Sequence, residues 1–314
     1  MYDTVNFWLD RVEVENITTP ALYLANSRET LNKETGELWT VGDMDNMRVT
    51  VSAAGVSIKG SLAKFYLPDN SYTLNRNQVK DAIIKLSDCL HIDLMKAKAT
   101  RIDVSTNFIM QNEASRYYSV LGLCNHFNRV QATSNTLYYY SRGKEQKKTL
   151  IFYDKAREIN NRDGILPDVY LGANLLRYES RWNTRLPQQL KVAEIKGKTL
   201  FDPSFYSNIV QCWADNYFKI EKKRTINTDA MDKIKTVSEA MNFICAIALQ
   251  KLPTDEIQDI LVDMKQKQVF KDRISYTRLK KKLKDIQGKT DLTDTDDLVR
   301  ELDAEMRQVL AYKR

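Results

Sequence analysis

The sequence predicts an α+β protein, in which an antiparallel sheet with helices on one face is followed by an all-α C-terminal domain. Before residue 200, segments that alternate apolar and polar residues with period two are mixed with helical segments. After residue 200 the pattern is almost wholly helical. Strand-rich and helix-rich parts of this kind indicate an α+β arrangement of layers. We therefore expect two domains, residues 1–200 and 201–314.

Several segments of the first part carry clear local signals. Met47–Ser52 and Val56–Gly60 alternate around an Ala53–Gly55 turn, which predicts a β-hairpin. A helix follows, with Asn75 or Asn77 as its N-cap. The other expected strands are Val5–Val14, Thr100–Phe108, Thr136–Ser141, Thr149–Lys155 and Leu175–Trp182, and the other expected helix is Ala114–Phe127.

Composition and charge narrow the class of protein. A hydrophobic content of 43% supports a sizeable core, and a net charge of +7 with a pI near 9.0 favours an anionic partner, either nucleic acid or a membrane surface. We expect no signal peptide at Met1–Val5, and no run reaches the ~20 apolar residues that span a bilayer. A cytoplasmic protein without a membrane partner is therefore expected.

The cysteines and histidines do not predict a zinc site. The four cysteines are far apart and form no CxxC pair, which is typical of reduced thiols in a cytosolic protein. The two histidines, His91 and His126, each fall in a helix or at its end, where a structural role is more frequent than metal binding.

Three of the expected strands have a polar face. Alternation places Arg101, Asp103, Ser105 and Asn107 on one side of the first strand, with apolar residues on the other side. This polar side is either a hydrated surface with a binding or catalytic role, or simply the solvent-facing side of a sheet.

On the second strand Tyr153 and Lys155 are expected to point the same way, and on the third Arg177, Glu179 and Arg181 share a face. The alternative interpretations are a tyrosine on a half-buried strand and a cross-strand ladder of ion pairs.

Taken together, the three polar faces suit phosphoryl transfer. Two or three oxygen ligands can hold Mg²⁺ or Mn²⁺, which polarises the scissile phosphate. A tyrosine hydroxyl, with an ordinary pKa of about 10, can attack phosphorus if a cation lowers that pKa. Arginine and lysine stabilise the charge that grows on the phosphoryl oxygens.

The order of these motifs carries a family resemblance. Thr-Arg-Ile-Asp at 100–103, Leu-Ile-Phe-Tyr-Asp-Lys at 150–155 with Glu158, and Leu-Arg-Tyr-Glu-Ser-Arg at 176–181 with Thr184-Arg185 follow one another. This series resembles the replication initiators of filamentous phages and related plasmids, the family of the gene II type. A looser likeness extends to the Rep-trans plasmid initiators, which carry a similar Tyr-x-Lys strand.

The resemblance covers roughly residues 1–190 and implies a Rep-like nickase domain that cuts one DNA strand at an origin with a divalent metal, Mg²⁺ or Mn²⁺. It implies that Tyr153 is the nucleophile and keeps the 5′ phosphate, with Lys155 as a base or a phosphate-contacting cation. It also implies that Asp103 and Glu179 are metal ligands. A weaker metal candidate is Glu158, and Arg101, Arg177 and Arg181 would contact phosphate or hold the carboxylates in place, with Arg185 as a further phosphate contact. Outside the resemblance, Lys147 and Lys148 of the basic loop and Lys281 of the basic helix are either DNA contacts or solvated charges.

One departure affects the metal. Many enzymes of the wider nickase superfamily hold their metal with a His-hydrophobic-His strand, and this chain has no such motif. If the fold is shared, the strand of Arg101 to Asn107 takes that role with oxygen ligands. Oxygen ligands favour Mg²⁺ or Mn²⁺ over zinc.

The helical part could read the origin duplex. Asp255–Met264 followed by the basic helix Ser275–Ile286 fits a helix-turn-helix, and the alternative is a bundle with a solvated lysine face. An oligomerisation role for this domain also stays open. The expected partner is origin DNA, as a single-stranded or cruciform nick site with flanking duplex, and a host helicase is left open.

Two other functions compete with rolling-circle initiation by a tyrosine nickase in a bacterial host cell. The first is a non-catalytic origin-binding protein, which would bind DNA in a salt-sensitive way without cleaving it. The second is a strand transferase resembling tyrosine recombinases or topoisomerases, which usually need no metal.

Overall fold

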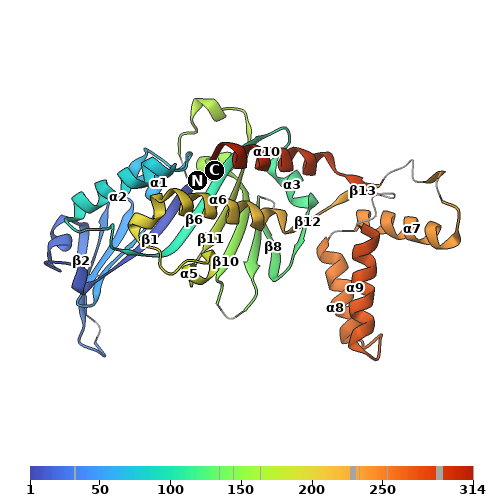
Figure 1. Cartoon of the computed structure of the whole chain (residues 1–314), viewed down its shortest axis with the longest axis horizontal. Helices are drawn as coiled ribbons and strands as arrows, with labels where there is room; N and C mark the ends of the chain where they lie inside the picture. The colour runs from blue at the N-terminus through green and yellow to red at the C-terminus, as the bar shows by residue number, and fades with distance from the viewer. Residues whose placement is uncertain are drawn as a thin grey trace.

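The computed structural model describes the whole chain except residues 32, 134, 144, 163, 227–230, 233, 253, 288–292 and 314. Its centre is a ten-stranded antiparallel sheet in the order β2-β3-β4-β5-β1-β6-β11-β10-β9-β8 (Figure 1). The strands are β1 Tyr2–Asp10, β2 Ala25–Leu31, β3 Leu38–Met44, β4 Met47–Ser52, β5 Gly55–Lys59, β6 Lys98–Met110, β7 Leu121–Cys124, β8 Phe127–Thr133, β9 Thr136–Ser141, β10 Lys148–Asp154, β11 Asn174–Trp182, β12 Ile220–Lys222, β13 Arg224–Ile226 and β14 Thr293–Thr295.

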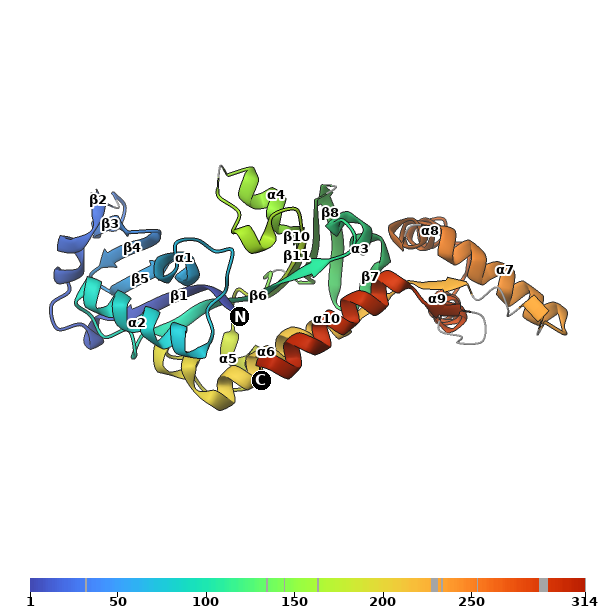
Figure 2. The same ribbon diagram turned by 90° about the horizontal axis from the view of Figure 1, so that it is seen from above.

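The long helices α2, α6 and α10 cover one face of the sheet, and the short helix α4 lies on the other side (Figure 2). We call the face that carries α4 the open face. The helices are α1 Leu62–Tyr66, α2 Arg76–Leu90, α3 Ala114–Val120, α4 Lys155–Asn160, α5 Leu186–Leu190, α6 Pro203–Phe218, α7 Val237–Lys251, α8 Thr254–Gln266, α9 Arg273–Gln287 and α10 Asp297–Lys313.

The main core lies between the sheet and the covering helices. Phe108 of β6 and Tyr178 of β11 meet Trp213 of α6, with ring centroids 6.3 and 5.1 Å apart. These rings fix which face of β6 and β11 points into the core. Because side chains alternate along a strand, Asp103 and Glu179 must point to the open face.

The sequence signals for several elements are confirmed. β4 and β5 form the expected hairpin, with Val49 opposite Ile58. α2 begins after Asn75, whose side chain accepts from the Gln78 amide while the Gln78 side chain accepts from the Asn75 amide, which is a capping box. The α+β class with an antiparallel sheet and a helical C-terminal region is confirmed.

The predicted helix at 114–127 is wrong in its second half. α3 ends at Val120, and the chain continues as β7, which pairs with β12. A Cβ on Gly122 would lie 3.0 Å from the Glu221 carbonyl oxygen, so the close approach of β12 favours glycine at this point. β12 comes almost 100 residues later in the chain, so local periodicity could not reveal the pairing.

The helices after residue 200 do not all stand apart from the sheet. Trp213 of α6 and Leu302 and Met306 of α10 belong to the main core, whereas α7, α8 and α9 lie beyond the β8 end of the sheet (Figures 1 and 2). Phe243 of α7 and Ile286 of α9 are buried in separate small clusters. The predicted division near residue 200 stays a prediction, and we call α7–α9 the helical appendage.

In the part of the chain that the structure describes, every helix is too short or too polar to cross a membrane.

Candidate active site

The open face is hollowed at its centre by a cavity of about 340 Å³. Tyr153 of β10 lies in its wall, together with equal numbers of acidic and basic side chains. The acids are Asp3, Asp103, Glu158 and Glu179, and the bases are Lys64, Arg101, Arg162 and Arg181. A phenol, carboxylates and cations thus meet in one place. The residues that supply them lie far apart in the sequence, from Asp3 to Arg181.

Strand register brings these groups together. Arg181 of β11 lies opposite Asp103 of β6, and Arg177 lies opposite both Asn107 of β6 and Tyr153 of β10. Directly opposed residues of antiparallel strands place their side chains on the same face, about 5 Å apart. The predicted polar faces of β6 and β11 are confirmed as one surface.

The two central carboxylates are almost completely buried and held by arginines. Asp103 is 1% exposed and receives two hydrogen bonds from Arg101, at 2.9 and 2.6 Å. Glu179 is 2% exposed, and the Nε of Arg181 donates to its Oε1 at 2.5 Å. The same Nε lies 3.6 Å from Asp103 Oδ2, so Arg181 bridges the two acids.

Burial makes the charge of Asp103 costly. Removal from water raises the pKa of Asp103 to about 7, and the neighbouring Glu179 charge adds to this increase, although Arg101 opposes it. Two buried acids side by side are only partly compensated by the arginines. An additional positive charge beside the pair would therefore stabilise the ionised form of both acids.

Beneath the cavity Arg177 is fully buried and makes four contacts. Its Nε donates to Asn107 Oδ1 at 2.7 Å, and its Nη2 donates to the Asn70 carbonyl at 2.6 Å. Its Nη1 lies 3.3 Å from Asp3 Oδ2 and 3.5 Å from the Tyr153 hydroxyl. Arg177 thus positions the tyrosine from below and does not line the cavity.

Tyr153 is protonated in the free protein at neutral pH. Burial raises its pKa well above the ordinary value, and Arg177 offsets this only in part. Any reaction that uses its phenolate needs more positive charge or a base at the hydroxyl.

The prediction that Lys155 follows Tyr153 on the strand is wrong. β10 ends at Asp154, whose side chain caps α4 by accepting from the Arg157 amide, and Lys155 is the first residue of that helix. The Lys155 side chain is fully buried, and its Nζ donates to Asn70 Oδ1 at 2.9 Å and Glu158 Oε2 at 2.6 Å. Burial, with Arg177 nearby, lowers the pKa of Lys155 to about 8.

Glu158 lines the cavity from α4, but its carboxylate is already engaged. One oxygen accepts from Lys155, and the other lies 2.9 Å from Arg162 Nε. It therefore stands apart from the Asp103–Glu179 pair as a weaker candidate for binding a cation.

The remaining predicted phosphate contacts do not reach the cavity. Lys148 points to the helix-covered face, where its Nζ lies 5.5 Å from the Trp182 ring and donates to Asn216. Arg185 pairs with Glu145 at 3.2 Å, and Lys147 is exposed in the loop before β10. Lys281 lies on α9 in the helical appendage.

Seven residues that line the cavity were not predicted from the sequence, namely Asp3, Thr4, Asn46, Ser61, Lys64, Asn70 and Arg162. Asp3 is 5% exposed and accepts from the Ser61 hydroxyl at 2.7 Å as well as from Arg177. Its only sequence signal is an acid at the start of an apolar strand.

Comparison with known proteins decides the family. A family model for the N-terminal part of the gene II protein, a replication-associated protein, matches residues 1–216. The chain belongs to this family. The match contains every strand and helix that lines the cavity, and it confirms the resemblance to replication initiators of the gene II type.

Other comparisons give little beyond this. A solved structure described as a rolling circle replication initiator protein from Geobacillus stearothermophilus is 13% identical and covers 81% of this chain and 97% of its own, with a TM-score of 0.41. That likeness is distant. No curated protein sequence gives a significant match.

The donor set of this site suits a hard cation. Asp103 and Glu179 offer carboxylate oxygens, and the buried Ser105 hydroxyl on the same face has no hydrogen-bond partner among the described residues. Mg²⁺ is commonly held by one or two carboxylates together with substrate phosphates and water. The described residues contain no group of three or more His, Cys, Asp or Glu side chains that could hold a metal by themselves.

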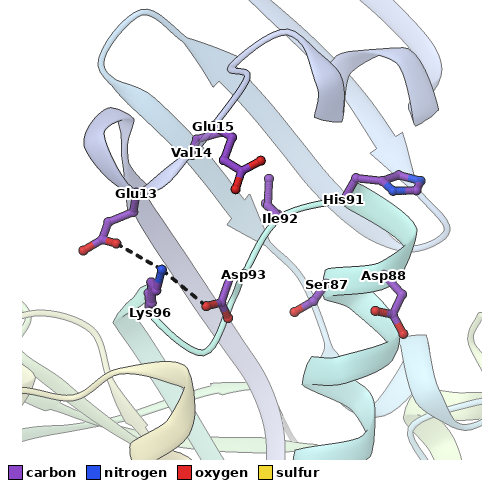
Figure 3. Close-up of a pocket in the computed structure, with 9 residues that line it drawn as sticks. All are labelled: Glu13, Val14, Glu15, Ser87, Asp88, His91, Ile92, Asp93 and Lys96. Carbon is purple, nitrogen blue, oxygen red and sulfur yellow. Dashed lines mark ion pairs between the residues drawn. The ribbon is translucent and has the colours of Figure 1, made fainter.

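A second hollow, between η1 (Arg11–Glu13) and the end of α2, is also rich in acids (Figure 3). Figure 3 shows Lys96 between Glu13 and Asp93, at 3.8 and 3.7 Å. His91 ends α2 with a positive φ, and its ring lies 4.3 Å from that of Tyr23. These contacts give His91 and Lys96 structural roles.

The raised pKa of Asp103 predicts a pH-dependent stability. The folded protein holds the Asp103 proton more tightly than the unfolded chain, so the wild type loses stability as pH rises from 3.8 to about 7. Each unit of pKa shift corresponds to about 1.4 kcal/mol, so the loss is on the order of a few kcal/mol. The Asp103→Asn variant lacks it, and urea unfolding in EDTA at pH 5 and pH 8 measures the difference. Parallel stability–pH profiles for the two proteins would contradict the assignment.

Proposed function

We propose that this protein initiates rolling-circle replication of a phage or plasmid by nicking one strand of origin DNA with Tyr153. The observation that carries the proposal is the cavity, which unites a single phenol with three buried carboxylates, those of Asp3, Asp103 and Glu179, and a set of cations. The family match supplies the replication context. A cytoplasmic location in a bacterial host is part of the same proposal.

The proposed step is an exchange of one phosphodiester for another. The Tyr153 oxygen attacks the scissile phosphorus and forms a P–O bond, while the bond to the 3′ oxygen breaks. The phenol proton passes to a cavity carboxylate or to water, and the departing 3′ oxygen takes a proton. The 5′-phosphotyrosine keeps the energy of the phosphoester, so the strand can later be rejoined.

The basic residues divide into two groups in this proposal. Arg177 and Lys155 are both buried. Arg177 reaches the Tyr153 hydroxyl and stabilises negative charge there as the proton leaves, whereas Lys155 binds Asn70 and Glu158. Because the pKa of Lys155 is about 8, its side chain is mostly protonated at pH 7. This favours the role of a cation over that of a base. Arg101 and Arg181 are about one third exposed and face the cavity, where they can bind phosphoryl oxygens.

Asp103 and Glu179, with the Ser105 hydroxyl, would hold Mg²⁺ or Mn²⁺. The hydrogen bond of Glu179 uses Oε1, so Oε2 is left for a cation. A bound ion would polarise the phosphate and stabilise its growing charge. Arg101 and Arg181 would then exchange their carboxylate partners for phosphate oxygens, which keeps each charge paired.

A non-catalytic origin binder is the second candidate, because a positively charged protein can grip DNA without cutting it. The half-buried phenol held by the buried Arg177 argues against that candidate, since DNA binding alone does not require a tyrosine positioned by a buried cation. A metal-independent strand transferase fits less well, because it gives no role to the adjacent buried acids Asp103 and Glu179.

The Tyr153→Phe variant tests the nucleophile. We expect it to form no covalent adduct with single-stranded origin DNA and Mn²⁺, because the attacking oxygen is gone, while its affinity for that DNA stays within about twofold. Denaturing gel electrophoresis of labelled DNA measures the adduct. Tyr140→Phe, on the same face of the sheet, is the matched control and keeps full adduct formation. An adduct that survives in Tyr153→Phe would move the nucleophile to another tyrosine.

The Glu179→Gln variant tests the metal. The wild type should lose nicking in EDTA and regain it with Mn²⁺, whereas Glu179→Gln should need a much higher Mn²⁺ concentration and nick at least about 100-fold more slowly. Titration of Mn²⁺ against the initial nicking rate gives both values. Glu158→Gln is the comparison, and a smaller effect of this variant would confirm that Glu158 is a weaker metal ligand than Glu179. Nicking by Glu179→Gln at the normal rate and metal dependence would remove Glu179 from the ligand set.

The helical appendage supplies a second DNA contact in this proposal. Residues 271–287 carry seven basic and two acidic side chains, and among the described residues only Lys284 of these bases forms an ion pair, with Glu221. Ile286 and Tyr276 face the rest of the appendage, so Lys281 lies on the opposite side of α9. An exposed basic helix face suits the phosphates of duplex DNA flanking the nick.

α8 and α9 run antiparallel. Tyr276, near the start of α9, donates to the Met264 carbonyl near the end of α8, and Ile257 of α8 packs in the cluster that contains Ile286. The appendage is therefore a helical hairpin packed on α7. Recognition of origin sequence by this hairpin, as in a helix-turn-helix, stays a prediction.

Removing two positive charges from α9 should weaken the electrostatic contribution to the binding of duplex DNA. For Arg278→Gln with Lys281→Gln we expect the slope of log affinity against log salt to fall by about 2, since each lost phosphate contact lowers it by about 0.9. Nicking of a short single strand should be unchanged. Lys267→Gln is the control, because Lys267 is paired with Asp263. An unchanged slope in the double variant would mean that these two side chains of α9 do not contact the DNA phosphates.

A further inference from the structure

Two tyrosines on the open face stack against each other beside the cavity. The rings of Tyr138 and Tyr140 lie 5.2 Å apart and are nearly parallel, with 6° between their planes. Tyr139, between them, points into the core, where its hydroxyl donates to the Gly122 carbonyl. The strand thus holds one ring inside and presents two rings, both only half-buried, on the side of the candidate active site.

The register of β9 with β10 places this pair next to the proposed nucleophile. Tyr153 lies opposite Thr136, and Ile151 lies opposite Tyr138. Tyr138 is therefore the diagonal neighbour of Tyr153 on the same face, and such neighbours are about 7–8 Å apart. A nucleotide next to a phosphate at Tyr153 lies within reach of the stacked rings.

Cations flank the ring pair on both sides. Arg181 of β11 contacts the Asp103–Glu179 pair and is close enough to affect Tyr140 electrostatically. Beyond β9, the exposed Arg142 donates to Asn128, which lies opposite Tyr140 on β8. Aromatic rings set between phosphate-binding cations are the usual arrangement in proteins that bind single-stranded nucleic acid.

The surface below the rings is apolar. Ile151 is 2% exposed although it lies on the open face, and it is not part of the main core. Val130 of β8, opposite Tyr138, is 42% exposed. Covering Ile151 is a role that any apolar side chain could fill, so aromatic rings at both positions call for a further reason.

We propose that Tyr138 and Tyr140 form a stacking platform for an unpaired base of the DNA strand bound at the cavity. The proposal rests on the proposed function for the nature of the ligand, a single-stranded DNA. Every base has a π-face, so stacking of this kind strengthens binding with little sequence preference. The platform holds the strand by a base while the cavity holds its phosphate.

Binding to bases can be separated from binding to the backbone. The probe is a fluorescent thymine oligonucleotide of about 16 nucleotides, within the usual site sizes of single-strand binders, compared with an abasic strand of equal length. Anisotropy is measured in EDTA, so no cleavage occurs. The wild type should bind the thymine strand about tenfold more tightly than the abasic strand, since stacking of one base contributes a factor of this order.

Paired variants identify the rings as the cause. Tyr138→Leu with Tyr140→Leu keeps an apolar cover over Ile151 and should lose most of the preference for bases. Tyr138→Phe with Tyr140→Phe keeps the rings and should retain it, which also distinguishes stacking from a chemical role of the hydroxyls. Equal preference in the leucine and wild-type proteins, or no preference in the wild type, overturns the proposal.

A second measurement needs no variant and covers the case of a leucine protein that fails to fold. Photocrosslinking of the wild type to a strand with 5-iodouracil should label Tyr138 or Tyr140, and labelling confined to other residues contradicts the platform. The outcomes are independent of the nicking assay. Base preference that depends on the two rings, together with an adduct that persists in Tyr153→Phe, would keep the platform and overturn the proposed nucleophile.

Discussion

The buried guanidinium of Arg177 is the interaction on which the candidate site depends. It joins Asn107 of β6, Asp3 of β1, Tyr153 of β10 and the loop that contains Asn70. A buried charge is costly unless its partners are in place, and removal of a partner is typically worth several kcal/mol. The fold and the site are therefore stabilised together, and the position of the phenol is set by the same side chain that ties three strands to one loop.

The cavity has a balance of charge rather than an excess. Two buried acids, Asp103 and Glu179, are matched by Arg101 and Arg181, and the raised pKa of Asp103 shows that the match is incomplete. A site of this kind can admit a cation and a phosphate together with little change of net charge. Under the proposed function, this balance would lower the electrostatic cost of bringing a highly charged substrate to a strongly desolvated surface.

Sequence alone could predict the surfaces but not every contact. Alternation along β6 and β11 placed Asp103 and Glu179 correctly, because a sheet with one apolar face leaves no other register. Lys155 could not be placed, since the strand ends one residue earlier and Asp154 caps a helix. Asp3 was missed because its partner Arg177 lies 174 residues away in the chain. Local patterns hold no information about such distant pairs.

The position of Tyr153 within β10 has a mechanical consequence. β10 is bonded to β11 along residues 148–154 and to β9 along residues 149–153, so it is anchored on both sides. A DNA strand joined to Tyr153 and pulled along β10 by a moving replication machine would load both ladders in shear, with many hydrogen bonds resisting at once. A tyrosine on an edge strand would be held by one ladder only, so fewer hydrogen bonds would resist the same pull. An interior strand such as β10 would thus give the proposed covalent link a firm attachment under tension.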